Sequence, residues 1–144
     1  MGGMGEVYLA EDTRLNRRVA LKFLPARFSD NDDIYTRFVR EARIPLRLNH
    51  PDVVSIYDVN NLDNRPFYAT ELIEGEVLHR YCHARPLPVD TMIVYAIRKC
   101  QGLGEAHRAG IIHRDVKSTN IIVDKNGRCT SLILVWRLTI RMRS

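Results

Sequence analysis

The sequence has no long apolar run, no C-x-x-C pair and no low-complexity tract. Its longest apolar stretch, residues 132–140, is interrupted by Arg137 and is far shorter than the roughly 20 residues that a helix needs to span a bilayer. The cysteines are odd in number and no signal-peptide pattern is visible, so a disulfide framework is not expected. We therefore expect a globular protein of the reducing cytoplasm without a membrane segment, and 144 residues suit one ordinary domain.

Acidic residues are missing from the end of the chain. Residues 128–144 hold four arginines and no acid; without these four, the 22 basic and 17 acidic residues leave a net charge of +1 instead of +5. No basic cluster with stacking groups occurs in residues 1–127, so a nucleic-acid partner is not expected. His79, Cys82 and His83 have helical spacing but no evident fourth ligand, which favours an exposed helical turn over a metal site.

The first half of the chain has the pattern of a small sheet with one helix. Residues 6–24 predict a meander of strands, and residues 53–59 and 66–73 predict a hairpin around the turn-rich segment 60–65. Between them, residues 29–33 offer a helix N-cap and an acidic first turn, followed by apolar residues at helical spacing. One helix is therefore expected over about 30–48.

After Gly75 the pattern becomes helical. Apolar residues repeat at intervals of three and four from Val89 to Leu103, and Gly110 can close this helix. A polar loop, residues 113–120, then separates short apolar runs, and Asn126-Gly127 is a strong tight-turn signal. Short strands around a polar loop suggest a functional site.

Two segments of the first half have residues suited to phosphate binding. Gly2, Gly3 and Gly5 would let main-chain N–H groups approach a phosphate, although such a turn is more often an ordinary β-turn. Lys22 lies within an apolar strand and Glu41 on the helix that follows. In kinase chemistry a lysine holds the α- and β-phosphates and a helix glutamate orients it; in isolation, each would be a surface charge.

The segment His113-Arg114-Asp115-Val116-Lys117-Ser118-Thr119-Asn120 matches the protein kinase catalytic-loop pattern. Phosphoryl transfer needs a carboxylate that accepts or orients the substrate hydroxyl proton, and an amide oxygen that helps to hold magnesium. Asp115 and Asn120 suit these two tasks. The alternative is a structural loop whose polar groups are satisfied internally.

Residues 2 to about 127 resemble a bacterial-type serine/threonine protein kinase in the order and spacing of these motifs. Further matches are Glu41-Ala42-Arg43, Leu48-Asn49-His50-Pro51 and Glu71-Leu72-Ile73-Glu74-Gly75. The resemblance implies an α+β, protein-kinase-like bilobal fold, truncated at both ends of the catalytic domain. The expected parts are a kinase N-lobe lacking its first strand at 1–74, the start of the C-lobe with the catalytic loop at 75–127, and a divergent basic tail at 128–144.

The resemblance also implies an activity and its site residues. The activity is transfer of the γ-phosphate of ATP, with Mg²⁺, to serine or threonine hydroxyls of a protein substrate. Thr70 would be the gatekeeper, and Lys117, typical of the serine/threonine class, would neutralise the transferred phosphate beside Asp115, with Asn120 on the metal. The residues expected to contact the nucleotide are Gly2, Gly3, Gly5, Val7, Ala20, Lys22, Glu41, Thr70, Glu71 and Ile73 through main-chain groups, and Ile122.

Three departures from the family pattern stand out. The glycine loop lacks its first glycine and the strand before it, so a sheet edge is expected to be exposed. Pro45 lies four residues after Glu41, which predicts a kink or an early helix end. Where the family has Asp-Phe-Gly, with its principal magnesium ligand, Ile133-Leu134-Val135 stand instead, and no aspartate follows Asp124.

These departures leave three hypotheses open. The chain is a kinase by ancestry whose activity is impaired, a non-catalytic pseudokinase-type module that binds a nucleotide or a partner, or a truncated product without a function of its own. The change of composition at Cys129 further suggests that a frameshift or a premature fusion produced the tail.

Overall fold

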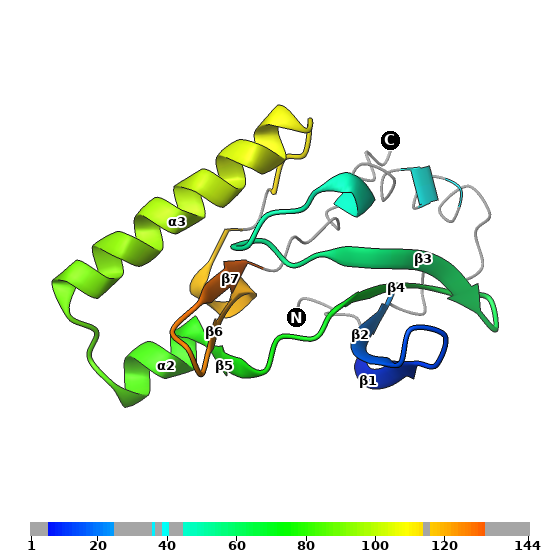
Figure 1. The fold of residues 1–144 in the computed structure, drawn as a ribbon, viewed down its shortest axis with the longest axis horizontal. Coiled ribbons are helices and arrows are strands. Elements are labelled where there is room, and N and C mark those ends of the chain that lie inside the picture. Colours follow the sequence, from blue (N-terminus) through cyan, green and yellow to red (C-terminus); the bar gives the residue numbers. More distant parts are fainter. Residues whose placement is uncertain (1–5, 25–35, 37–38, 41–44, 114–115, 132–144) are drawn as a thin grey trace, which may run out of the picture.

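The computed structural model describes residues 6–24, 36, 39–40, 45–113 and 116–131 (Figure 1). Two sheets are present in this part of the chain. The first has four strands in the order β1-β2-β4-β3, and the second has three in the order β5-β6-β7. Figure 1 shows the second sheet between the long helix α3 and the four-stranded sheet.

The four-stranded sheet is antiparallel throughout. It consists of β1 (Val7–Asp12), β2 (Arg17–Phe23), β3 (Ile56–Leu62) and β4 (Arg65–Glu71). The strands β1 and β2 follow the meander predicted for residues 6–24. β1 lies at an edge, and the side chains of Val7 and Leu9 are largely exposed there.

The hairpin of β3 and β4 was expected, but its turn is tighter than the predicted 60–65. Only Asp63 and Asn64 form the turn, with φ of 50° and 60°. Both residue types tolerate the left-handed region, and two successive left-handed residues match the twist of a hairpin. The segment 60–62 can therefore continue β3 and pair with β4.

The helix predicted for residues 30–48 falls largely outside the described residues. Residues 36, 39 and 40 are helical, and Pro45–Arg47 form the 3-10 helix η2. A proline has no N–H for an α-helical bond and its ring crowds the preceding turn. The kink or early helix end expected near Pro45 involves residues 41–44, which lie outside the described residues, so it stays a prediction.

The second region begins at Gly75. A Cβ added at Gly75 would lie 2.3 Å from the Val123 carbonyl oxygen, so only glycine allows β5 to approach β6 this closely. The tight turn expected at Asn126-Gly127 is present, with a φ of 74° at Gly127. The elements are β5 (Gly75–Val77), α2 (Leu78–Ala84), α3 (Val89–Arg108), η3 (Ser118–Asn120), β6 (Ile121–Asp124) and β7 (Cys129–Ser131).

Helix α3 covers the residues predicted to be helical from the apolar spacing, but the face that it buries differs from the predicted one. It follows Pro88 and carries Asp90 in its first turn. Its buried residues are Tyr95, Lys99, Gly102 and Ala106, whereas Met92, Ile93 and Ile97 of the predicted apolar repeat are about half exposed. Gly110, with a φ of 80°, donates its N–H to His107, and Ile111 donates to Ala106, which is the Schellman arrangement. No helix in the described part of the chain is long and apolar enough to cross a membrane.

Three apolar clusters connect these elements. Leu24, Ile56 and Tyr68 form the core of the first sheet. The second cluster joins the loop before β3 to the end of α3, and the third packs α3 on β6 and β7. Burial on one side of each element therefore fixes both the sheets and the position of α3.

Candidate functional site

The predicted phosphate-binding lysine lies in the middle of the four-stranded sheet. Lys22 on β2 pairs with Val7 on β1 and with Tyr68 on β4. Its ammonium lies 5.9 Å from the centroid of the Tyr68 ring, and its side chain is half-buried. Burial lowers the pKa of Lys22, because desolvation disfavours the charged form.

The predicted gatekeeper lies across from the predicted base-packing alanine. Ala20 on β2 pairs with Thr70 on β4, and Thr70 is buried. The Thr70 hydroxyl donates to the carbonyl oxygen of Glu71 at 3.1 Å and lies 3.5 Å from that of Ala20. The hydroxyl thus has partners despite its burial, and it fixes the carbonyl of the first hinge residue.

Residues 72–74 link β4 to β5 and form the connection between the two regions. The N–H of Glu71 donates to the Ser55 carbonyl, and Ile73 is partly exposed in the connection itself. An open cavity of about 330 Å³ lies against this connection. It is lined by residues 71–74, by Arg18, and by Asp124, Lys125, Asn126 and Arg128 from the β6–β7 turn.

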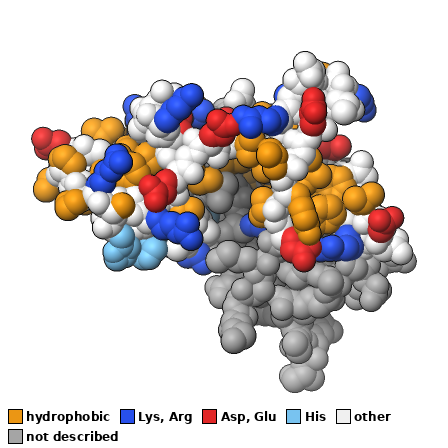
Figure 2. Space-filling model, turned by 90° about the horizontal axis from the view of Figure 1, so that it is seen from below, with side chains coloured by type: hydrophobic (Ala, Val, Ile, Leu, Met, Phe, Trp, Pro, Cys, Tyr) orange, Lys and Arg blue, Asp and Glu red, His pale blue; other side chains and the backbone are white. Residues whose placement is uncertain are grey.

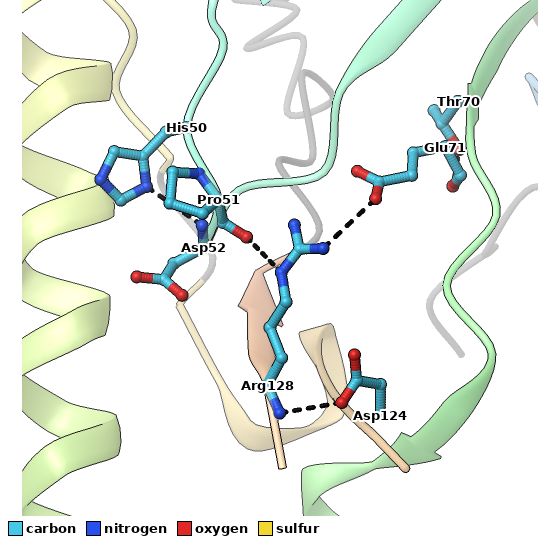
Figure 3. Close-up of polar contacts among 7 residues, drawn as sticks. All are labelled: His50, Pro51, Asp52, Thr70, Glu71, Asp124 and Arg128. Carbon is cyan, nitrogen blue, oxygen red and sulfur yellow. Dashed lines mark hydrogen bonds and ion pairs between the residues drawn. The ribbon is translucent and has the colours of Figure 1, made fainter. Parts of the chain in front are cut away.

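Arg128 joins three segments that are far apart in the sequence (Figure 3). Its Nε donates to the Pro51 carbonyl at 2.6 Å, and its Nη1 lies 3.5 Å from Oε1 of Glu71. Its own N–H donates to the Asp124 carboxylate at 2.9 Å. From the sequence, Arg128 was only one of the charges of the basic tail, because nothing in its surroundings indicates contacts to residues 51 and 71.

Lys99 contacts the same segment before β3 that Arg128 contacts at Pro51. This lysine on α3 is buried, and its ammonium donates to the Asp52 carbonyl at 3.1 Å. That carbonyl also accepts the N–H of Ser131 at 2.9 Å. Burial lowers the pKa of Lys99. The helical spacing gave no sign of this contact, because a lysine among apolar residues usually points outward.

The predicted catalytic loop is described in part. Asn120 is buried in η3 and its N–H donates to the carbonyl of Lys117, whose side chain is exposed. His113 is buried as well. Ile122 lies in β6, paired with Val77 and Thr130, so it belongs to the second sheet rather than to the sheet of Lys22.

Five of the predicted site residues lie outside the described residues. They are Gly2, Gly3, Gly5, Glu41 and Asp115. The structure therefore pairs Val7 with Lys22 and Ala20 with Thr70, and connects Thr70 directly to the hinge. The position of the glycine loop, the helix glutamate and the catalytic carboxylate relative to this group remains a prediction.

Within the described ranges, no group of three or more His, Cys, Asp or Glu residues could hold a metal ion. The rings of His79 and His83 meet edge to face on α2, with centroids 4.7 Å apart. Figure 2 shows basic side chains interspersed with acidic and apolar ones on one face of the molecule.

Comparison with known proteins gives the same family by sequence and by structure. The model of the protein kinase domain family matches residues 1–135. The serine/threonine-protein kinase PknL of Mycobacterium bovis is 41% identical over 127 residues, covering 88% of this chain and 32% of PknL. PknB of Mycobacterium leprae is 40% identical over 127 residues, covering 85% of this chain and 20% of PknB.

The solved kinase domain of Mycobacterium tuberculosis PknI, as its C20A mutant, superposes with a TM-score of 0.81 at 27% identity. The match covers 94% of this chain and 57% of that domain. The chain thus spans between a fifth and a third of the curated relatives named here, and just over half of a solved kinase domain. The bilobal kinase fold expected from the motifs is confirmed, and the chain belongs to the protein kinase domain family.

Proposed function

We infer that this chain forms the nucleotide-binding side of a serine/threonine protein kinase domain. The observation that carries this proposal is the position of Lys22, a half-buried lysine two residues from Ala20, which lies opposite Thr70 at the start of the hinge. A desolvated ammonium interacts strongly with a phosphate, because little water screens the pair. The hinge carbonyl and N–H groups lie one strand away, in β4 and the connection after it.

The proposed nucleotide site divides into a base end and a phosphate end. At the base end, main-chain groups of Glu71 and Ile73 hydrogen-bond adenine while Val7, Ala20 and Ile122 pack on it. At the phosphate end, Lys22 holds the α- and β-phosphates, Glu41 orients the lysine, and main-chain N–H groups of Gly2, Gly3 and Gly5 contact the phosphates. Thr70 limits the space behind the base.

The catalytic loop supplies the transfer chemistry in this proposal. Asp115 accepts or orients the proton of the substrate serine or threonine hydroxyl, and Lys117 neutralises charge on the transferred phosphate. Asn120, held in η3, offers an amide oxygen to magnesium. The proposed division is an N-lobe at 1–74, a C-lobe start at 75–127 and a divergent tail at 128–144.

The residues of this chain do not fit a complete magnesium site. Mg²⁺ prefers several oxygen ligands in octahedral geometry, usually with one or two carboxylates. The sequence has no acid after Asp124, and only Asn120 is assigned to the metal. We therefore propose that the chain binds ATP but transfers its phosphate poorly, a pseudokinase-like state. Exposed free thiols at Cys82 and Cys100 suit the cytoplasm as its compartment.

A thermal shift with ATP tests nucleotide binding. A ligand that binds only the folded state raises its apparent stability, so we expect ATP to raise the melting temperature with EDTA present and magnesium to add little. K22M should lose the shift, whereas R80M, which removes an exposed charge on α2, should keep it. An equal shift in both variants would contradict the proposal.

Transfer of labelled phosphate to a generic basic protein tests the proposed impairment. We expect no more label from the chain than from its D115N variant. Label clearly above that control would show that the chain transfers phosphate in spite of its incomplete magnesium site.

A further inference from the structure

The strand β7 combines a well-paired backbone with one buried hydroxyl that has no partner. Its main chain pairs with β6 on one side, and on the other Ser131 accepts from the Val54 N–H and donates to the Asp52 carbonyl, both at 2.9 Å. Its side chains, Cys129, Thr130 and Ser131, are all buried, the first two at 0% exposure. The Thr130 hydroxyl has no hydrogen-bond partner.

A strand whose side chains are buried on both faces of the sheet normally has apolar residues there. An unpaired buried hydroxyl costs about 1–3 kcal/mol. The backbone of β7 thus fits its surroundings and Cys129 packs in the core, whereas Thr130 does not suit its buried position. Thr130 lies in the part of the sequence that has no acidic residues, which begins after Asp124. Further along the same part, Ile133-Leu134-Val135 stand where the family has Asp-Phe-Gly.

We propose that the coding sequence changes reading frame within codons 128 to 131, and that the missing magnesium-binding aspartate is encoded by the last base of codon 132 and the first two bases of codon 133. The inference rests on membership of the kinase family and not on the activity proposed above.

The genetic code permits the whole motif in this frame. Every isoleucine codon begins with AT, so a Leu132 codon ending in G yields the triplet GAT, which encodes aspartate. An ATT codon for Ile133 followed by TTG for Leu134 yields TTT, phenylalanine. The final G of that TTG and the GT of Val135 yield GGT, glycine.

The flanking codons agree with the same frame. The only tryptophan codon ends in G, so Trp136 followed by a CGN codon for Arg137 yields GCG, alanine. Upstream, the TG of Cys129 preceded by any base encodes Leu, Met or Val. The TC of a TCN codon for Ser131 preceded by any base encodes Leu, Ile, Val or Phe. Entered at codon 128, the frame thus restores large apolar residues at positions 129 and 131.

The third possible frame excludes the motif. Its triplets begin with the middle base of each codon, and this base is T in all codons for leucine, isoleucine and valine. From Leu132 to Val135 every triplet would begin with T, whereas aspartate and glycine codons begin with G. Only one of the two alternative frames can therefore encode Asp-Phe-Gly here.

The direction of the shift follows from the register. If this chain has lost one base upstream, the uninterrupted frame places the aspartate at position 133, where the spacing of the family motifs expects it. Gain of two bases would place it at position 132 instead. The loss of a single base is thus the shift that this chain indicates.

Sequencing the gene from source DNA over codons 120 to 144 tests this assignment without any requirement for folding. We expect codons 132, 133 and 134 to read CTG or TTG, ATT, and TTG. An extra base in codons 128 to 131 would make the frame continuous, and its absence would place the shift in the gene itself; either result supports the proposal if these three codons are found.

Any other codon at one of the three positions overturns it and favours a fusion with unrelated sequence. Such a result would leave the nucleotide site intact, because Lys22, Thr70 and the hinge precede the shift.

Discussion

The strands β4 and β7, from the two sheets, differ in how well a buried threonine is accommodated. Each has a buried threonine, Thr70 in β4 and Thr130 in β7. The hydroxyl of Thr70 donates to a hinge carbonyl, whereas that of Thr130 has no partner. The buried threonine therefore suits its position in β4 and does not suit it in β7.

This difference indicates where the family sequence ends within the chain. Before the β6–β7 turn, the buried Thr70 hydroxyl and Lys99 ammonium have partners, although Nε of Arg65 has none. After the turn, the Thr130 hydroxyl is buried without a partner. The first sheet and α3 are therefore expected to tolerate little change, whereas β7 should accept substitutions that make it more apolar.

The largest effect is expected where the second sheet requires glycine. In G75A the added Cβ would lie 2.3 Å from the Val123 carbonyl oxygen, so β5 must move away from β6. Urea unfolding should show a loss of about 3 kcal/mol, at the upper end for overpacked sites. The control G104A meets no atom within 4 Å on α3 and should gain up to about 1 kcal/mol. Similar stability of the two variants would contradict the fit of β5 against β6.

The two threonines should respond with opposite signs to the same substitution. T130V removes a buried hydroxyl without a partner and should stabilise the chain by about 1–2 kcal/mol. T70V removes a hydroxyl that donates to the Glu71 carbonyl and should destabilise it by about 1 kcal/mol. Urea midpoints at constant m-value measure both. Changes of equal sign would show that β7 is no worse fitted than β4.

The arginine that joins the two regions is expected to contribute less. R128M loses the bonds to Pro51 and Glu71, and because the guanidinium is about a third exposed we expect a loss of about 1 kcal/mol. R108M, which loses an exposed pair with Glu105, should change stability by less than about 0.5 kcal/mol. If R108M were the more damaging variant in thermal unfolding, the bridge at Arg128 would be unimportant.

A small change in stability, of either sign, is expected when Lys99 is replaced by methionine. K99M removes the cost of burying an ammonium, and the Asp52 carbonyl keeps its bond from Ser131, so stability should stay within about 1 kcal/mol or rise. K99A should lose about 2 kcal/mol or more through the cavity.

The lowered pKa of Lys99 determines how the free energy of unfolding changes with pH. The folded pKa is lowered, so the unfolded state binds more protons and wild-type stability rises with pH between the lowered pKa and the ordinary value of 10.5. Any advantage of K99M should therefore shrink as the pH rises through that window. An advantage that grows with pH would contradict a desolvated ammonium.

Most of the fold could be predicted from the sequence because local patterns determine it. The meander of β1 and β2, the β3–β4 hairpin and the span of α3 follow from alternation, turn residues and apolar spacing. The buried face of α3 does not, because it includes Lys99 and Gly102 instead of the predicted apolar repeat. The β3–β4 turn is shorter than predicted, because Asp63-Asn64 forms a tight left-handed turn that composition alone does not separate from its polar neighbours.

The site was less accessible to prediction. The pairing of Ala20 with Thr70 agrees with the order of motifs, but the contacts of Lys99 and Arg128 join segments more than 45 residues apart. Such contacts depend on how elements pack and leave no local pattern. The requirement for glycine at position 75 likewise comes from the close approach of β6.

Protection of Lys22 by ATP tests the central claim most directly. The chain would be treated with an amine-reactive reagent with and without ATP in EDTA, and labelling at each lysine would be measured by mass spectrometry. We predict that ATP strongly reduces labelling of Lys22 and reduces that of the exposed Lys125 much less. Equal labelling of Lys22 with and without ATP would contradict a nucleotide site at this lysine.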